Sequence, residues 1–242
     1  MARLIAGMGT SHVPGVGAAM DNGKTDEPYW RELFAGFAPL RAWHADNVPD
    51  VNIVVFNDHA TSMSLNHYST FMMGVAEYFA PADEGWGPRK VPVVEGHPEL
   101  AWHIVESLIL DEFDMAVTAE FDVDHGLTVP LSIAYDQPAA WPAKVIPLCV
   151  NVIQHPQPTP LRCYKLGQAI RRAVDSFPED LTVGIWGTGG LSHQLGGERA
   201  GVVNPDFDRM FLDNLVNDPM ANTRFTHTDF IREAGSEGIE MI

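Results

Sequence analysis

Four histidines each follow shortly after a run of apolar residues that is typical of a buried strand. The runs and their histidines are Arg3–Met8 with His12, Val51–Phe56 with His59, Met115–Ala119 with His125, and Leu181–Trp186 with His193. Neutral imidazole is the commonest metal ligand in proteins, and it also exchanges protons readily near neutral pH. In α/β sheets, ligands bind beyond the carboxyl ends of the strands. The recurring placement therefore predicts one site in which several imidazoles act together.

A carboxylate would complete a metal site of this kind. Two imidazoles and one carboxylate on one face of the ion form the non-haem Fe(II) arrangement, which leaves the opposite face open for substrate and O₂. The same ligand types also bind zinc in hydrolases, so a zinc hydrolase is a second interpretation. Spacing alone does not choose the carboxylate. The candidates are Asp58, Asp122, Asp124, Glu237 and Glu240.

Other kinds of site have weaker support in the sequence. The chain has no G-x-S-x-G motif for a serine nucleophile. The GTGG run at 187–190 lacks the Lys-Ser/Thr pair of a phosphate-binding loop and indicates a tight turn beside the site. The two cysteines, Cys149 and Cys163, are interpreted as buried free thiols. The remaining histidines are interpreted as surface or structural residues: His44, His67, His97, His103, His155 and His227.

Strands that alternate with helices must position these residues. A further strand is predicted at Lys144–Val152, and the periodicity of apolar residues predicts helices at Pro98–Phe113, Pro160–Phe177, Asp206–Val216 and Thr228–Ile242. Residues 28–46 read as a helix broken near Gly36 and Pro39, and Pro81–Pro98 reads as a long ordered loop. The alternation predicts one α/β domain, with a mainly parallel central sheet covered by helices on both faces.

Composition limits the partners of the chain. The 242 residues carry a net charge of −17 at pH 7, which argues against nucleic acid and against an anionic membrane surface as partners. No stretch approaches the roughly 18 uninterrupted apolar residues of a membrane helix. The first residues do not read as a secretory signal. We therefore expect a cytoplasmic protein.

Nine segments follow one another along the chain in a familiar order. They are TSHVPGVGAA, FNDHA, PADEGWGPR, GHPELAWHIVESLILDEFD, DVDHG, SFPEDL, WGTGGLSHQL, ERAG and GSEGIE. Together they resemble the class III (LigB-type) extradiol ring-cleavage dioxygenases, and among these the β subunits of protocatechuate 4,5-dioxygenase. The resemblance implies a single α/β domain and a role in the catabolism of aromatic, lignin-derived compounds.

The resemblance also implies a role for each candidate residue. His12 and His59 would bind Fe(II), with Glu240 as the carboxylate ligand. His193 would be the acid–base residue, and His125 would contact a substrate hydroxyl. Two neighbours of His59 complete the set: Asn57 would line the substrate pocket, and Asp58 would accept hydrogen bonds behind the ligands or at a turn.

The implied reaction is extradiol ring opening of a carboxylated catechol with O₂, and protocatechuate is the first expected substrate. Gallate or 3-O-methylgallate is the alternative substrate, and a catalytically inactive metal-binding homologue is the alternative from another class. The resemblance further implies a small helical α subunit in an α₂β₂-like assembly. Because family β subunits continue beyond the motif that contains Glu240, the catalytic domain at residues 1–242 is expected to be shortened at its C-terminus.

Overall fold

Strand β2 (Val51–Phe56) lies in the middle of a six-stranded sheet, and nearly all of its residues are buried. The computed structural model, which describes all 242 residues, places β2 between β7 (Lys144–Val150) and β8 (Thr182–Thr188), both parallel to it. Strand β1 (Arg3–Thr10) is parallel to β8 on the outer side. Strands buried on both faces are near-continuous apolar runs, which explains why the sequence located β2 to the residue.

The last two strands of the sheet run in the opposite direction. The order is β1-β8-β2-β7-β3-β6, in which β3 (Phe71–Gly74) is antiparallel to β7 and β6 (Ala116–Thr118) is parallel to β3. The mainly parallel sheet is confirmed, but β6 ends at the edge opposite to the ends of β2 and β8. The chain then returns through residues 119–124, where Val123 forms a bridge with Pro81. His125 therefore does not reach the site directly from a strand end, which corrects the expected placement.

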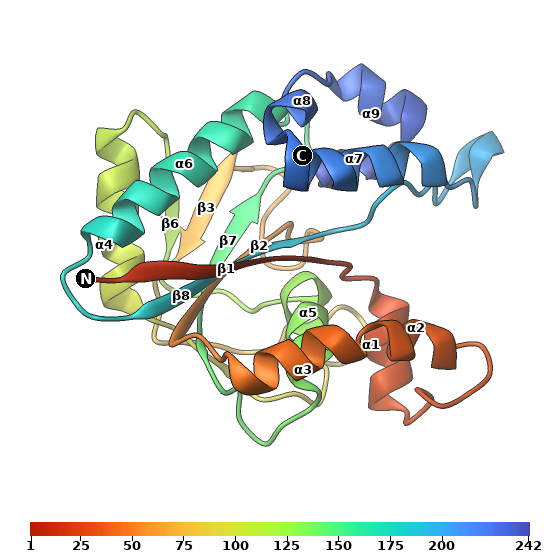
Figure 1. Ribbon diagram of the computed structural model, residues 1–242, viewed down its shortest axis with the longest axis horizontal. Coiled ribbons are helices and arrows are strands. Elements are labelled where there is room, and N and C mark those ends of the chain that lie inside the picture. Colours follow the sequence, from red (N-terminus) through yellow and green to blue (C-terminus); the bar gives the residue numbers. More distant parts are fainter.

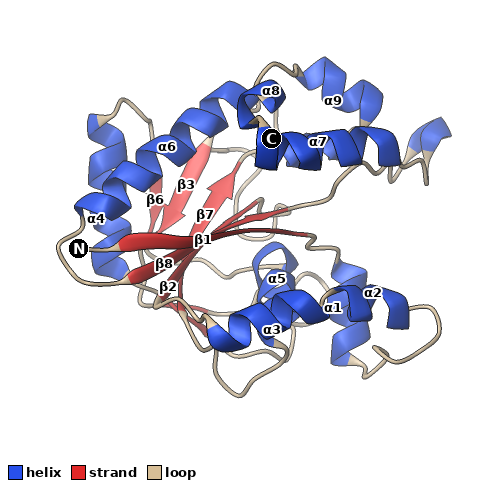
Figure 2. Cartoon of the chain, viewed as in Figure 1, coloured by secondary structure: helices blue, strands red, loops and turns tan.

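Helices cover both faces of the sheet, as predicted (Figures 1 and 2). One face carries the helices α4 (Pro98–Leu110) and α6 (Pro160–Ser176), and the other carries α5 (His125–Tyr135), α1 (Pro14–Asp21), α2 (Arg31–Gly36) and α3 (Ala38–Asp46). The predicted break near Gly36 is confirmed, because α2 ends there. The predicted start of α6 is also confirmed, because the Thr159 side chain accepts a hydrogen bond from the Arg162 amide.

Short elements complete the chain. The predicted long loop contains strand β5 (Val94–Glu95), which pairs with β4 (Tyr78–Phe79). The C-terminal part consists of the 3-10 turn η1 (Gly197–Arg199) and the helices α7 (Pro205–Asn217), α8 (Pro219–Asn222) and α9 (His227–Glu233). Both cysteines are free, as predicted, although Cys163 is only partly buried. None of the helices combines the length and the apolar composition that crossing a bilayer requires.

The single helix predicted over Thr228–Ile242 is wrong. Helix α9 ends before Gly235, whose φ of +96° lies in the left-handed region that favours glycine. A Cβ at Gly235 would also collide with the carbonyl oxygen of His193. The chain then forms the 3-10 turn η2 (Glu237–Met241), whose Ile239 and Met241 pack into an apolar cluster with α7 and α9. The break therefore decides where Glu240 lies.

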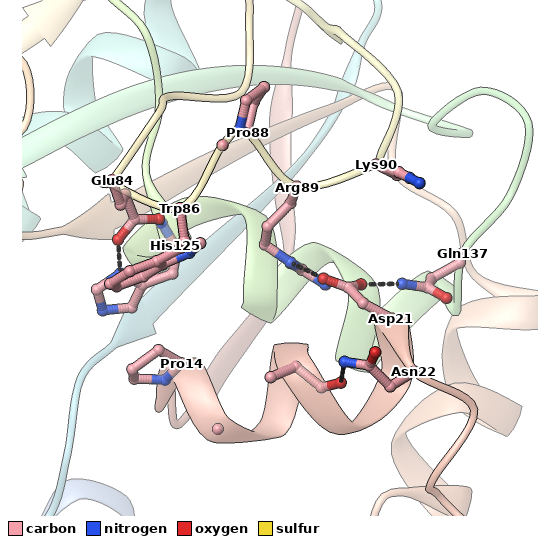
Figure 3. Close-up of a pocket in the computed structure, with 13 residues that line it drawn as sticks. Pro14, Asp21, Asn22, Glu84, Trp86, Pro88, Arg89, Lys90, His125 and Gln137 are labelled. Carbon is pink, nitrogen blue, oxygen red and sulfur yellow. Dashed lines mark hydrogen bonds and ion pairs between the residues drawn. The ribbon is translucent and has the colours of Figure 1, made fainter.

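Arg89 ties the loop before β5 to helices α1 and α5 (Figure 3). Its Nε and Nη2 donate to the two carboxylate oxygens of Asp21 over 2.9 and 2.8 Å. Its Nη1 and Nη2 lie 3.3 Å from the hydroxyl oxygens of Thr128 and Ser132. The Arg89 side chain is only 9% exposed and that of Asp21 24%. Through these contacts Arg89 joins helix α1, which follows His12, to helix α5, which begins at His125.

Replacing Arg89 by alanine is expected to lower the free energy of unfolding by about 2 kcal/mol, because it removes a nearly buried guanidinium and two charged hydrogen bonds to the Asp21 carboxylate. Urea unfolding followed by circular dichroism measures the change. Arg3→Ala is the matched control, since the Arg3–Asp180 pair is 60% and 80% exposed. Exposed pairs contribute less than about 1 kcal/mol. Equal effects of the two substitutions would contradict a stabilising role for the Arg89 pair.

Candidate metal centre

His12 follows β1 and is held through one ring nitrogen. Its Nδ1 lies 3.1 Å from the hydroxyl oxygen of Thr188. That hydroxyl has a single proton and donates it to a carbonyl, either that of Val55 at 2.9 Å or that of Gly126 at 3.3 Å. The Thr188 oxygen therefore accepts from His12 Nδ1–H, and Nε2 keeps its lone pair. This Nε2 is buried and has no hydrogen-bond partner, as befits a ligand atom for a metal ion.

His59 is fixed by the buried carboxylate of Asp124. The backbone N–H and the Nδ1–H of His59 both donate to Asp124 Oδ2, over 2.8 and 2.9 Å. The other carboxylate oxygen accepts from the Gly126 amide over 2.8 Å at the start of α5. Since Nδ1 carries the proton, Nε2 of the neutral ring carries a lone pair, and the Asn57 amide nitrogen lies 3.2 Å from it.

Burial and hydrogen bonding shift the pKa values of His59 and Asp124 in opposite directions. Burial by itself would lower the pKa of His59, but the hydrogen bond and the charge of Asp124 raise the pKa above its ordinary value. Burial by itself would raise the pKa of Asp124, but the hydrogen bonds from His59 hold the pKa below its ordinary value. Asp124 is thus an anion that fixes the orientation of the His59 ring.

Glu240 reaches the two imidazoles from η2. Its Oε2 lies 3.5 Å from His12 Nε2, and its Oε1 lies 3.9 Å from His59 Nε2. The Gly190 amide donates to Oε2 over 2.9 Å. Burial would raise the pKa of Glu240, but contact with His12 and the Gly190 amide lowers it to about 2. The carboxylate is therefore ionised at neutral pH.

The three side chains present a donor set that suits a metal ion. Ligand atoms of His12, His59 and Glu240 all lie within 4.8 Å of one another. Bonds of about 2.1 Å to one ion would place neighbouring ligand atoms roughly 3 to 3.5 Å apart, which is close to the distances found. Two neutral imidazoles and one carboxylate, with one imidazole nitrogen buried and unpartnered, could therefore hold a divalent metal.

The other candidate carboxylates are not part of the group formed by His12, His59 and Glu240. Asp58 accepts hydrogen bonds from the amides of Thr61, Ser62 and Met63, so its side chain organises the turn after β2. This geometry agrees with the interpretation of Asp58 as an acceptor at a turn. Glu237 accepts from the hydroxyl of Ser236 over 2.6 Å. Asp122 is exposed, and Asp124 lies behind His59.

His125 begins α5 and lies against the rings of His12 and His59. Its ring stacks on His59 with a centroid distance of 4.0 Å, and the His12 ring is 5.8 Å away, edge-on. The carboxylate of Glu84 accepts from both the backbone N–H and the Nδ1–H of His125. No local sequence pattern predicted this contact, because Glu84 lies on a loop and is 41 positions from His125.

His193 is not part of this ring cluster but lies next to it. Its Nδ1–H donates to the Leu191 carbonyl over 2.8 Å, so the neutral ring has its lone pair on Nε2. The ring packs so closely on Gly190 that a Cβ there would collide with it. Because the Gly190 amide binds Glu240, His193 borders the carboxylate side of the centre.

A pocket of about 500 Å³ adjoins His125 between α1 and the loop that carries Glu84 (Figure 3). Pro14 and Gly15 of α1 form one wall, and the exposed ring of Trp86 forms part of the other. The predicted long loop therefore lines a cavity beside the candidate centre. Of the residues that support the centre, Thr188 and Glu84 were missed by sequence reasoning, and Asp124 had been weighed only as a ligand.

Replacing Asp124 by asparagine is expected to weaken metal binding by about 10- to 100-fold. An amide offers only one acceptor oxygen, so it cannot bind the two donors of His59 and the Gly126 amide together. Anaerobic titration of a divalent metal measures the affinity. Asp122→Asn is the control, because this carboxylate is exposed. An unchanged affinity in the Asp124 variant would show that the His59 ring needs no fixed acceptor.

Comparison with known proteins agrees with this geometry. The family model described as the catalytic LigB subunit of aromatic ring-opening dioxygenase matches residues 6–242. The chain is 50% identical over 161 residues to a gallate dioxygenase of Pseudomonas putida, covering 66% of this chain and 47% of that protein. It is 28% identical over 200 residues to a 2,3-dihydroxyphenylpropionate/2,3-dihydroxicinnamic acid 1,2-dioxygenase of Photorhabdus laumondii, covering 82% of this chain and 59% of the relative. The chain spans about half the length of these curated relatives. It belongs to the LigB family of catalytic subunits of aromatic ring-opening dioxygenases.

Proposed function

We propose that the protein opens the ring of a carboxylated catechol with O₂, by extradiol cleavage, at a non-haem Fe(II) held by His12, His59 and Glu240. The observation that carries the proposal is the convergence of two imidazole lone pairs and one ionised carboxylate, with His12 Nε2 buried and unpartnered. This ligand set is the one that non-haem Fe(II) oxygenases use. Membership of the LigB family supports the same reaction class.

Several residues of the chain would hold the proposed metal ligands in position. Bound Fe(II) would favour loss of a proton from a substrate hydroxyl and allow electron transfer between the ring and O₂. Thr188 and Asp124 hold the Nδ1–H groups of the two histidine ligands, so that both Nε2 atoms face the same point. The backbone amide of Gly190 keeps Glu240 in position.

Two further histidines would act on the substrate. The Leu191 carbonyl holds His193 Nδ1–H, which leaves Nε2 free to take a proton from substrate and return it. His125 would bind a substrate hydroxyl from the pocket side, and Asn57 would line the substrate position next to His59. A fixed imidazole orientation favours such roles because it removes the need to reorganise during the reaction.

Protocatechuate and gallate are the two proposed substrates. The resemblance of the sequence segments favours protocatechuate, whereas the 50% identity to a gallate dioxygenase favours gallate. 3-O-methylgallate is a further alternative of the same class. All three substrates carry a carboxylate and an aromatic ring whose oxygen substituents can bind a metal.

The test is anaerobic reconstitution with Fe(II), followed by oxygen uptake with each of the three substrates. We expect one O₂ to be consumed for each ring opened, with the highest kcat/KM for protocatechuate or gallate. Zinc reconstitution is the control, since zinc has no redox chemistry and should give no uptake. Fe(II) binding without oxygen uptake on any substrate would contradict the proposed reaction and favour a non-catalytic metal-binding protein.

We also propose a small helical partner subunit in an α₂β₂-like assembly, on the basis of the resemblance to β subunits that have such a partner. Co-expression with a candidate helical subunit, followed by size-exclusion chromatography, tests the assembly. Elution of this chain only as a free subunit would contradict it.

A further inference from the structure

Both oxygens of the Glu84 carboxylate accept hydrogen bonds from a single residue of the site, His125. Its Oε1 accepts from the backbone N–H of His125 over 3.0 Å, and its Oε2 accepts from the Nδ1–H of the same residue. The two side chains are only 9% and 10% exposed. No lysine or arginine forms an ion pair with Glu84. Figure 3 shows the carboxylate directly beside the ring at the pocket wall.

The loop is built to present Glu84 in this position. The neighbouring Asp83 accepts hydrogen bonds from the amides of Gly85 and Gly87, over 2.9 and 2.8 Å. Both glycines have positive φ, +98° and +85°, which a residue with a side chain would adopt only at a cost. Arg89 then anchors the end of the turn to Asp21. The tight turn therefore holds the Glu84 carboxylate over the N-terminus of α5.

A carboxylate that only accepts hydrogen bonds decides which ring nitrogen of His125 carries the proton. An ionised carboxylate has no proton to donate, so its partner Nδ1 must be the protonated nitrogen. The neutral ring then has its lone pair on Nε2, which forms no hydrogen bond with the protein. The ring itself lines the pocket.

We propose that Glu84 is a positioning residue that locks His125 in the Nδ1–H tautomer, so that Nε2 accepts a hydrogen bond from a substrate hydroxyl. The kinetic part of this inference rests on the proposed ring-opening function, whereas the tautomer is a property of the protein alone. A histidine that could choose either tautomer would offer an acceptor to the substrate for only part of the time. Glu84 also fixes the ring plane, because it binds the backbone and the ring of the same residue.

Glu84→Gln tests the inference with a side chain of nearly the same size. The amide has one acceptor oxygen and one NH₂ donor. The backbone N–H of His125 is a fixed donor and takes the oxygen, so the NH₂ faces Nδ1 and the ring changes to the Nε2–H tautomer. An equivalent carboxylate-to-amide change beside the catalytic histidine of a serine protease lowers kcat about 10⁴-fold.

The direct readout is the tautomer, measured by long-range ¹H–¹⁵N NMR on protein loaded with diamagnetic zinc. We expect the Nδ1–H form of His125 in the original chain, the Nε2–H form in Glu84→Gln, and the Nδ1–H form again in Glu84→Asp, which keeps the charge. Glu120→Gln, a change at an exposed carboxylate, should leave the spectrum of His125 as it was. An Nδ1–H form in Glu84→Gln overturns the inference.

The second readout is oxygen uptake by the Fe(II)-reconstituted protein. Glu84→Gln should lower kcat at least about 100-fold while metal affinity stays within about threefold, and Glu84→Asp should recover part of the loss. In a His125→Ala background, Glu84→Gln should cause no further loss, because Glu84 acts through His125. A further loss there overturns the positioning role.

The two proposals fail in different ways. A tautomer change in Glu84→Gln, found in a protein that opens no ring, supports control of His125 by Glu84 and contradicts the proposed reaction. Ring opening at an unchanged rate in Glu84→Gln supports the proposed reaction and overturns the role of Glu84 in it. If the glutamine variant does not fold, the Nδ1–H form with partial activity in Glu84→Asp supports the inference, and the Nε2–H form there overturns it.

Discussion

His59→Ala is expected to abolish metal retention, with a loss of affinity well above the 10- to 100-fold that removal of a supporting residue causes. The substitution removes one of two imidazole lone pairs and leaves only His12 and Glu240 of the proposed ligand set. It also leaves the buried carboxylate of Asp124 without its ring partner. Metal content after gel filtration and anaerobic titration with Fe(II) measure the loss, and oxygen uptake should fall to background.

His67→Ala is the matched control, since this histidine lies eight residues after His59, in a turn beyond β2, and is exposed. It should bind metal like the original chain. Circular dichroism separates loss of the ligand from loss of the fold. A folded His59→Ala variant that retains one metal per chain would show that the ion is held by other residues, and the proposed ligand set would be wrong.

His193→Ala is expected to keep the metal but lower kcat by about 10²- to 10⁴-fold, the range typical of a removed acid–base group. The His193 ring is held at Nδ1 by the Leu191 carbonyl and packs on Gly190. It is not one of the mutually packed rings of His12, His59 and His125. Its removal takes away a proton acceptor without taking away a ligand atom. The measurement is kcat from oxygen uptake, together with metal content of the same sample.

The control for His193 is the same His67→Ala variant, which should have unchanged turnover. Two results would contradict the assignment. Unchanged kcat in His193→Ala would remove this histidine from the acid–base role. Loss of metal would show instead that the ring supports the Gly190 amide that binds Glu240.

The sequence predicted the strands that deliver His12, His59 and His193 from their apolar runs, and the prediction was sharpest for β2, which is buried along nearly its whole length. A fully buried strand cannot alternate apolar and polar residues, so VNIVVF is continuous and ends where the polar residues begin. Helix starts were also readable, since a capping threonine followed by proline acts within a few residues. Local signals of this kind do not depend on the rest of the chain.

Elements without such local signals were missed or misassigned. Strand β3 has four residues, too few to establish a period. Helix α5 is buried on every side and contains Pro130, which the sequence alone would place outside a helix. The direction of β6 depends on its pairing with β3, so the route of the chain to His125 is a tertiary property.

For the candidate centre too, some features follow from the sequence and others only from the tertiary structure. The sequence by itself established the imidazoles and their approximate convergence, because parallel strands end at one edge of a sheet. It left five carboxylates open as ligands, and only packing distinguishes them. Asp58 accepts a hydrogen bond from the turn after β2, and Asp124 accepts one from His59. The break at Gly235 brings Glu240 to the Gly190 amide. The partners of Nδ1 in His12, His59 and His125 lie 176, 65 and 41 positions away in the chain. Only the tertiary structure could decide which nitrogen of each ring is left to bind, because a tautomer is fixed by contacts that no local spacing encodes.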